Sequence, residues 1–156
     1  VDMNVDVDFD VDVDLGVDVD VGVDVDGGMN GGGSDLGIVV FSRSRNRLIL
    51  NQQQLCNVLH ARFKRPVTVL TMENHTFEEQ VYVLRRSILA IGMHGSALVM
   101  AAFLPRGATL VELFPYAVPP HNYTPYKTMA SELGLRYVAW VNVVADEGKN
   151  IAHPHR

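Results

Sequence analysis

The segment Gly92-Met93-His94-Gly95-Ser96-Ala97 carries the residue types best suited to bind an anion. It joins two apolar stretches and is predicted to form a turn between a strand and a helix. Glycine lets backbone N–H groups approach a ligand, and the N–H groups at a helix start favour negative charge. The turn therefore predicts a phosphate cradle made by His94, Gly95 and Ser96. The alternative is a structural turn, because the segment matches neither a Walker A loop, nor the full dinucleotide fingerprint, nor a nucleophile elbow.

A second candidate is the basic segment Ser42-Arg43-Ser44-Arg45-Asn46-Arg47, which follows another apolar run. Guanidinium groups neutralise phosphates through charge-assisted hydrogen bonds. Arg43 and Arg47 are the candidates to bind a diphosphate leaving group, and a solvated basic loop is the alternative.

Glu112 lies near the end of the apolar run 108–114. A carboxylate in that position can accept the two hydroxyls of a ribose, as acidic residues do in nucleotide-binding folds. The alternative is a partly exposed glutamate without a ligand. Glu73 and His75, near the end of another apolar run, are further candidates to approach a base or a ribose.

No metal site is expected. His153 and His155 lack a third ligand, and Asp-x-Asp patterns occur only in the N-terminal repeat. A site that needs neither a metal nor another cofactor is the better interpretation.

Short apolar runs alternate with helical patterns through the body of the chain. Strands are predicted at 37–42, 67–72, 90–93, 108–114 and 135–141, with helices starting near 51 and 76 and spanning 97–104 and 126–133. Strands and helices that alternate in this way typically fold into a parallel sheet with helices on both faces. The predicted fold is therefore an α/β, Rossmann-like domain, which binds ligands beyond the carboxyl ends of its strands.

Two of these helices carry capping-box patterns, Asn51 with Gln54 and Thr76 with Glu79. The spacing of apolar residues predicts which side chains each helix buries. These are Leu55, Val58, Leu59 and Phe63 in the first, and Val81, Tyr82, Leu84 and Ile88 in the second.

Charge divides the chain into two parts. Residues 1–35 contain 11 Asp and no Lys or Arg, whereas residues 36–156 contain 13 basic and 7 acidic residues, a net charge of +6. The near-dipeptide Val-Asp repeat and the Gly-rich stretch after it predict a disordered low-complexity tail over 1–36. A folded domain is expected over 37–145 and a short tail over 146–156. The mildly basic body suits an anionic small ligand, and no nucleic-acid partner is expected.

The body resembles glycosyltransferase family 61. The resemblance rests on ordered segments that cover about two-thirds of the chain: Ile38–Arg43, Asn46–Asn51, Gly92–Gly95, Phe103–Ala108, Val111–Val118, Tyr123–Thr128 and Tyr137–Trp140. It implies one half of a GT-B enzyme, in which two Rossmann-like domains enclose the active site. The implied reaction is inverting transfer of N-acetylglucosamine from UDP-GlcNAc to O-linked mannose on a glycoprotein such as α-dystroglycan, in the endoplasmic reticulum.

The matched part corresponds to the donor-binding domain of that architecture. By position, Arg43 and Arg47 would meet the diphosphate, His94, Gly95 and Ser96 would form the phosphate cradle, and Glu112 would bind the ribose. An acceptor domain, a membrane anchor and a catalytic base are not recognised in this chain. We therefore expect it to bind UDP without transferring sugar.

Two alternatives remain open. One is a non-catalytic UDP-sugar-binding remnant of such an enzyme. The other is a hydrolase built on Ser96, which is disfavoured because the sequence shows neither a nucleophile elbow nor an acid placed to orient a histidine.

Overall fold

The computed structural model describes residues 36–45, 47–116, 118, 120 and 124–142. The predicted tails therefore lie outside the described residues, with one exception. Leu36 is partly buried against the core, and its carbonyl accepts a hydrogen bond of 3.0 Å from Nη1 of Arg65. The folded body thus begins by Leu36.

Strands and helices alternate in the order that the sequence predicts. They are β1 (Gly37–Ser42), α1 (Gln52–Phe63), β2 (Val67–Thr71), η1 (Met72–Asn74), α2 (Phe77–Arg85), β3 (Ser87–Met93), η2 (Ser96–Phe103), β4 (Thr109–Phe114), α3 (Pro125–Glu132) and β5 (Arg136–Val141). Both η1 and η2 are 3₁₀ helices, whereas a small α-helix was expected over 97–104. None of the described helices has the length and apolarity to cross a bilayer.

The five strands form one sheet in the order β2-β1-β3-β4-β5, and every neighbouring pair is parallel. The chain first moves from β1 to β2 on one side and then crosses back to β3 on the other side of β1. The direction of winding therefore changes between β1 and β3. In an open α/β sheet this switch point, at the carboxyl ends of the strands, is where ligands bind.

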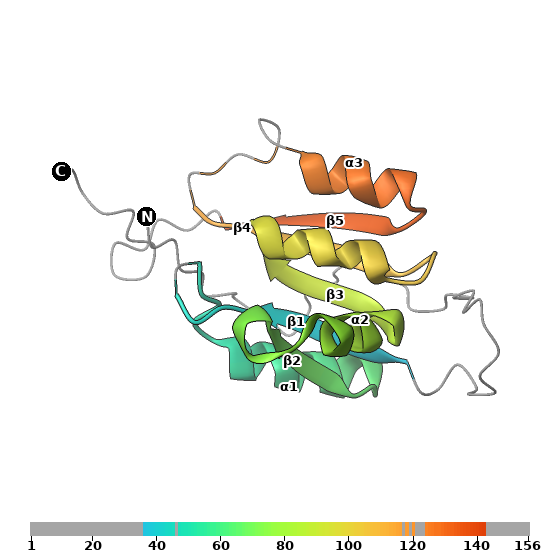
Figure 1. Ribbon diagram of the computed structural model, residues 1–156. Helices are drawn as coiled ribbons and strands as arrows, with labels where there is room; N and C mark the ends of the chain where they lie inside the picture. Colours follow the sequence, from blue (N-terminus) through green and yellow to red (C-terminus); the bar gives the residue numbers. More distant parts are fainter. Residues whose placement is uncertain (1–35, 46, 117, 119, 121–123, 143–156) are drawn as a thin grey trace.

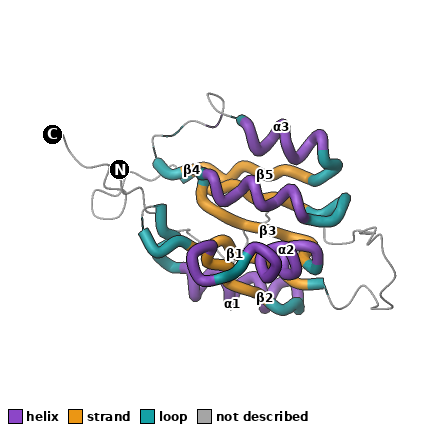
Figure 2. Tube along the Cα trace, in the orientation of Figure 1, coloured by secondary structure: helices purple, strands orange, loops and turns teal. Residues whose placement is uncertain are grey.

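Helices cover both faces of the sheet, as predicted (Figures 1 and 2). Leu55 and Leu59 of α1 pack on one face, against a cluster that includes Ile38 and Ile91. On the other face, α2, η2 and α3 contribute Leu84, Leu98, Ala101 and Ala130 to a second cluster. The central strands β3 and β4 are buried along their whole lengths, as expected for parallel strands covered on both sides.

The two capping predictions had different outcomes. Thr76 accepts a hydrogen bond of 3.3 Å from the Glu79 amide, and Glu79 accepts one of 2.8 Å from the Thr76 amide, so this capping box is confirmed. The box predicted for Asn51 was wrong. Asn51 has φ −99° and ψ 34°, outside the extended conformation of an N-cap, and its side chain makes no capping bond.

The predicted helix faces were partly right. Leu55, Leu59 and Leu84 are buried, but Val58 and Tyr82 are 38% and 66% exposed. Ile88 is buried as a residue of β3, not as part of the helix, because α2 ends at Arg85. The apolar pattern missed Gln80, a residue of α2 that faces the protein interior and is 8% exposed.

Candidate functional site

The predicted site residues come from three segments that meet at the switch point. Arg43 and Arg47 follow β1, His94 to Ser96 follow β3, and Glu112 lies on β4 beside β3. Because β1 and β3 are hydrogen-bonded neighbours, the basic loop and the glycine turn emerge from the sheet side by side.

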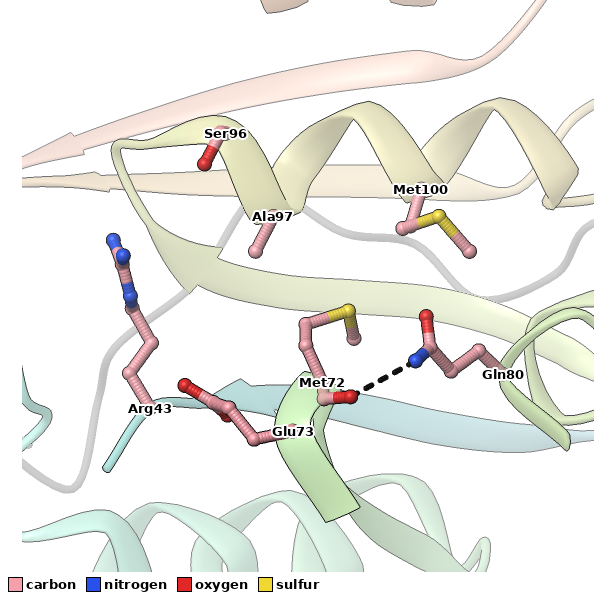
Figure 3. Close-up of a pocket in the computed structure, with 7 residues that line it drawn as sticks. All are labelled: Arg43, Met72, Glu73, Gln80, Ser96, Ala97 and Met100. Atoms are coloured by element: carbon pink, nitrogen blue, oxygen red, sulfur yellow. Dashed lines mark hydrogen bonds between the residues drawn. The ribbon is translucent and has the colours of Figure 1, made fainter. Parts of the chain in front are cut away.

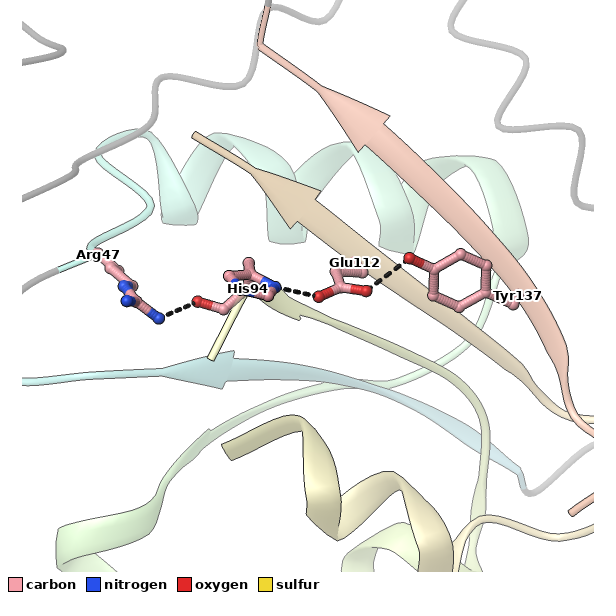
Figure 4. Close-up of polar contacts among 4 residues, drawn as sticks. All are labelled: Arg47, His94, Glu112 and Tyr137. Carbon is pink, nitrogen blue, oxygen red and sulfur yellow. Dashed lines mark hydrogen bonds and ion pairs between the residues drawn. The ribbon is translucent and has the colours of Figure 1, made fainter. Parts of the chain in front are cut away.

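Both arginine side chains reach the backbone of the glycine turn. Nη1 of Arg47 donates a hydrogen bond of 2.6 Å to the carbonyl oxygen of His94 (Figure 4). A Cβ atom placed on Gly95 would lie 2.9 Å from Nη1 of Arg47 and 3.1 Å from Nη1 of Arg43. Glycine suits position 95 because its φ of 158° is rarely adopted by residues with a side chain, and because the two guanidinium groups occupy the space beside its Cα atom.

Arg47 adopts φ 57°, in the left-handed region. This conformation costs a residue with a side chain roughly 1–2 kcal/mol. The bond from Arg47 to the His94 carbonyl offsets part of that cost and holds the guanidinium over the turn.

The imidazole of His94 faces away from the arginines, toward β4 and β5. Its Nδ1 lies 2.5 Å from Oε1 of Glu112, and the hydroxyl of Tyr137 donates a hydrogen bond of 2.5 Å to Oε2 (Figure 4). The ring also stacks on Phe114 at a centroid distance of 5.0 Å and meets Tyr126 edge-on at 6.0 Å. Hydrogen bonding to a carboxylate fixes the ring orientation and places a proton on Nδ1.

Glu112 is fully buried, and both of its carboxylate oxygens are bonded to protein side chains. The alternative interpretation of Glu112 as a partly exposed glutamate is therefore wrong. Direct contact between Glu112 and a ribose remains a prediction, and it would require one of these two bonds to be exchanged.

A cavity of about 270 Å³ lies on the other side of the turn, between the end of β2 and the start of η2 (Figure 3). Arg43 and Ser96 line it, together with five residues not in the predicted phosphate site: Met72, Glu73, Gln80, Ala97 and Met100. The cavity thus adjoins the same arginine that reaches Gly95.

The structure brings five of the six predicted site residues to one edge of the sheet: Arg43, Arg47, His94, Gly95 and Ser96. Glu112 lies behind His94. Gly92 has a packing role instead of a ligand-binding one, since a Cβ atom there would lie 2.9 Å from Leu98 of η2.

Tyr137 and Gln80 were missed by the sequence analysis. Tyr137 belongs to this cluster because β5 pairs with β4, and that pairing has no signal in the local sequence. Gln80 occupies a buried helix position that an apolar pattern does not mark.

One argument against a hydrolase was also wrong, because Glu112 does orient His94. The geometry supplies a different argument. Ser96 lines the cavity beside Met100 and Gln80, whereas the His94 ring packs against Phe114 of β4 and Tyr126 of α3. The hydroxyl and the imidazole therefore face different elements.

Tyr137 makes the stability of the domain depend on pH in the alkaline range. Burial and, secondarily, Glu112 raise the pKa of the Tyr137 phenol above its ordinary value. The unfolded chain releases this proton first, near pH 10. The contribution of Tyr137 to stability is therefore complete below about pH 10 and is lost as the pH rises beyond that value.

We expect Tyr137→Phe to lower the free energy of unfolding by about 1–3 kcal/mol at pH 8, because Oε2 of Glu112 loses its donor. The variant should also lose part of the decline in stability above pH 10. Urea unfolding between pH 8 and pH 11 measures both effects. Tyr82→Phe, at an exposed tyrosine, is the control and should keep the wild-type slope. A Tyr137→Phe profile identical to wild type would contradict the bond to Glu112.

Within the described part of the chain, no group of three or more His, Cys, Asp or Glu side chains is placed to hold a metal ion. That the site works without a metal ion stays a prediction.

The fold and the site define a doubly wound α/β domain with two arginine side chains at its topological switch point. Comparison with known proteins adds the family. The profile described as Glycosyltransferase 61 matches residues 32–111. The chain belongs to this glycosyltransferase family.

Several relatives of the chain carry the same name. The chain is 47% identical over 129 residues to the Mus musculus protein O-linked-mannose beta-1,4-N-acetylglucosaminyltransferase 2. The matched region covers 80% of this chain and 22% of the relative. The Homo sapiens protein of the same name is 47% identical over 121 residues, covering 76% and 20%. The Tetraodon nigroviridis protein is 45% identical over 128 residues, covering 81% and 22%. The chain therefore spans about a fifth of the length of these relatives.

Proposed function

We propose that this domain binds the donor of an inverting glycosyltransferase that moves N-acetylglucosamine from UDP-GlcNAc to O-linked mannose on a glycoprotein. The acceptor class and the sugar follow the names of the relatives, and UDP as the carrier follows the family resemblance. The proposal includes the GT-B arrangement, an acceptor such as α-dystroglycan, and the endoplasmic reticulum as the compartment.

The observation that carries the proposal is the meeting of Arg43 and Arg47 at Gly95. The two guanidinium groups lie 2.9 Å and 3.1 Å from the position that a Cβ atom on Gly95 would take, and they place two positive charges at the switch point. Guanidinium groups bind phosphate oxygens strongly because each can donate two parallel hydrogen bonds. A diphosphate is the ligand chemistry that such a pair of cations fits best.

The same two residues serve the chemistry of transfer. As the mannose hydroxyl attacks the anomeric carbon, the bond to the β-phosphate breaks and negative charge builds up on the departing UDP. Fixed cations stabilise that charge where it develops. The acceptor proton must pass to a base, which we assign to the other domain of the enzyme.

His94 and Glu112 position this arginine site. Glu112 and Tyr137 hold the His94 ring, and the His94 carbonyl in turn holds the Arg47 guanidinium. We assign Glu112 the role of positioning the turn through His94; contact with the ribose would require Glu112 to exchange its bond to His94 or to Tyr137.

Gly95→Ala is expected to weaken UDP binding about tenfold or more. The added methyl group would displace the two guanidinium groups, which are the flexible ends of long side chains and can move away. Stability should fall by about 1–3 kcal/mol, because Gly95 has φ 158° and ψ 172°, a conformation that residues with a side chain rarely adopt. Calorimetric titration and urea unfolding of the same preparation separate the two effects. Unchanged UDP affinity in a folded variant would contradict the cradle.

A chimera tests the transferase assignment. The body of this chain replaces the matching 129 residues of the Mus musculus relative, and transfer from UDP-GlcNAc to an O-mannosylated peptide is measured. We expect transfer to be retained. A folded chimera that binds UDP but transfers no sugar would favour the non-catalytic remnant.

The 156-residue chain alone is expected to bind UDP without turnover, because the acceptor side and the base belong to the second domain of a GT-B enzyme. Transfer catalysed by the isolated chain would contradict this division of roles.

A further inference from the structure

The cavity beside Arg43 contains a hydrogen-bond acceptor with a fixed orientation. The side chain of Gln80 projects from α2 into the space between η1 and η2, and the residue as a whole is 8% exposed. Its amide nitrogen donates hydrogen bonds of 3.1 Å to the Met72 carbonyl and 2.9 Å to the His75 carbonyl. Because both partners are acceptors, only the nitrogen can occupy that side of the amide.

The amide oxygen therefore faces the opposite way. In Figure 3 it points away from the Met72 carbonyl, toward the side of the cavity where Met100 lies. Among the described residues, no donor is recorded within hydrogen-bond distance of this oxygen, whereas both hydrogens of the amide nitrogen have partners. This oxygen is not sealed from solvent, because among the described residues no fully buried side-chain nitrogen or oxygen lacks a partner. It faces the space of the cavity, where a ligand that brings an N–H group can donate a hydrogen bond to it.

The walls beside Gln80 suit a flat and compact group. The thioether side chains of Met72 and Met100 and the methyl group of Ala97 are apolar. Glu73 lines the cavity as well, and its Oε1 accepts a hydrogen bond of 3.3 Å from the hydroxyl of Ser44. Methionine sulfur makes favourable contacts with aromatic rings. Ser96 and Arg43, on the side of the glycine turn, offer donors to carbonyl oxygens.

The size of the cavity limits what it can hold. Its volume of about 270 Å³ is just below the roughly 300–1,000 Å³ of pockets that enclose a complete small ligand. The cavity therefore has room for one part of a nucleotide sugar.

We propose that this cavity binds the uracil base of the donor and that Gln80 selects uracil by accepting its N3–H. The inference rests on the proposed function, which supplies a uridine nucleotide whose diphosphate lies at Arg43. Uracil has an N–H at position 3 between two carbonyl oxygens, matching one acceptor and nearby donors. Cytosine has an unprotonated nitrogen at position 3, so two acceptors would face each other.

Three nucleotides test the assignment without changing the protein. UDP, CDP and N3-methyl-UDP are titrated into the chain by calorimetry. We expect UDP to bind about tenfold or more tightly than either of the others, the ratio that one buried hydrogen bond of about 1.4 kcal/mol gives. N3-methyl-UDP is the decisive probe, because it keeps both carbonyl oxygens and removes only the donor.

Gln80→Met supplies the matching change in the protein, since methionine has a similar length and lacks the acceptor. The preference for UDP over N3-methyl-UDP should fall to about twofold or less in a variant shown to be folded. Gln53→Met is the control. Gln53 is an exposed glutamine of α1, and its replacement should leave the preference unchanged.

The outcomes separate this inference from the proposed function. If UDP does not bind, both are wrong. If UDP and N3-methyl-UDP bind with similar affinity, the diphosphate site stands and the assignment of the cavity is overturned. It is overturned equally if Gln80→Met weakens UDP-GlcNAc but not UDP, because the cavity would then hold the acetamido group.

Discussion

Replacing Glu112 with alanine is expected to destabilise the domain strongly. The carboxylate is fully buried and accepts bonds from His94 and Tyr137. Its removal leaves two donors without partners, at about 1–3 kcal/mol each. The total, about 2–6 kcal/mol, is a large part of the 5–15 kcal/mol that usually separates folded from unfolded domains.

Glu112→Gln is the matched comparison. Its carbonyl oxygen can still accept from Nδ1 of His94, and its amide can donate to the Tyr137 oxygen after the hydroxyl rotates. We expect a loss of less than half that of Glu112→Ala. Urea unfolding followed by circular dichroism measures both variants. A Glu112→Ala midpoint close to wild type would show that this cluster does not stabilise the fold.

The double variant Arg43→Ala, Arg47→Ala is expected to lose nearly all affinity for UDP. A hydrogen bond to a charged group contributes about 1.5–3 kcal/mol, so each arginine accounts for roughly a tenfold to hundredfold change. The fold should survive, since both side chains are only partly buried and lie in a loop. Calorimetric titration with UDP measures the loss.

Arg62→Ala is the control for charge alone. Arg62 is an exposed residue of α1 and lies over the ring of Phe63. It should change UDP affinity by less than about twofold at physiological salt, where distant charges are screened. An equal loss in the control and in the double variant would mean that net charge, and not the cradle, attracts UDP.

The fold could be predicted largely from the sequence because its signals are local. Short apolar runs marked the strands, and Thr76 with Glu79 marked the start of α2. Asn51 showed the limit of that method, since a suitable residue type does not ensure the backbone angles that a cap requires. The prediction that Tyr82 is buried was wrong for a related reason, because helical spacing alone does not say where the edge of the buried face lies.

The candidate site was predicted as a set of segments but not as a network. The order of strands and helices was enough to place Arg43, Arg47 and Gly95 at one edge of the sheet. The burial of Glu112 depends on strand register, which pairs it with Gly92 on one side and Ala139 on the other. Its bond to Tyr137 and the free face of the Gln80 amide are long-range consequences of packing.

The central claim is that the turn after β3 and the arginines after β1 bind a diphosphate. Parallel calorimetric titrations of this chain with UDP and with uridine test it most directly, because the two ligands differ only in the diphosphate. We expect saturable binding of UDP at one site and binding of uridine at least about a hundredfold weaker, since two charged contacts are lost. Equal affinities for UDP and uridine, or no binding of UDP, would contradict it.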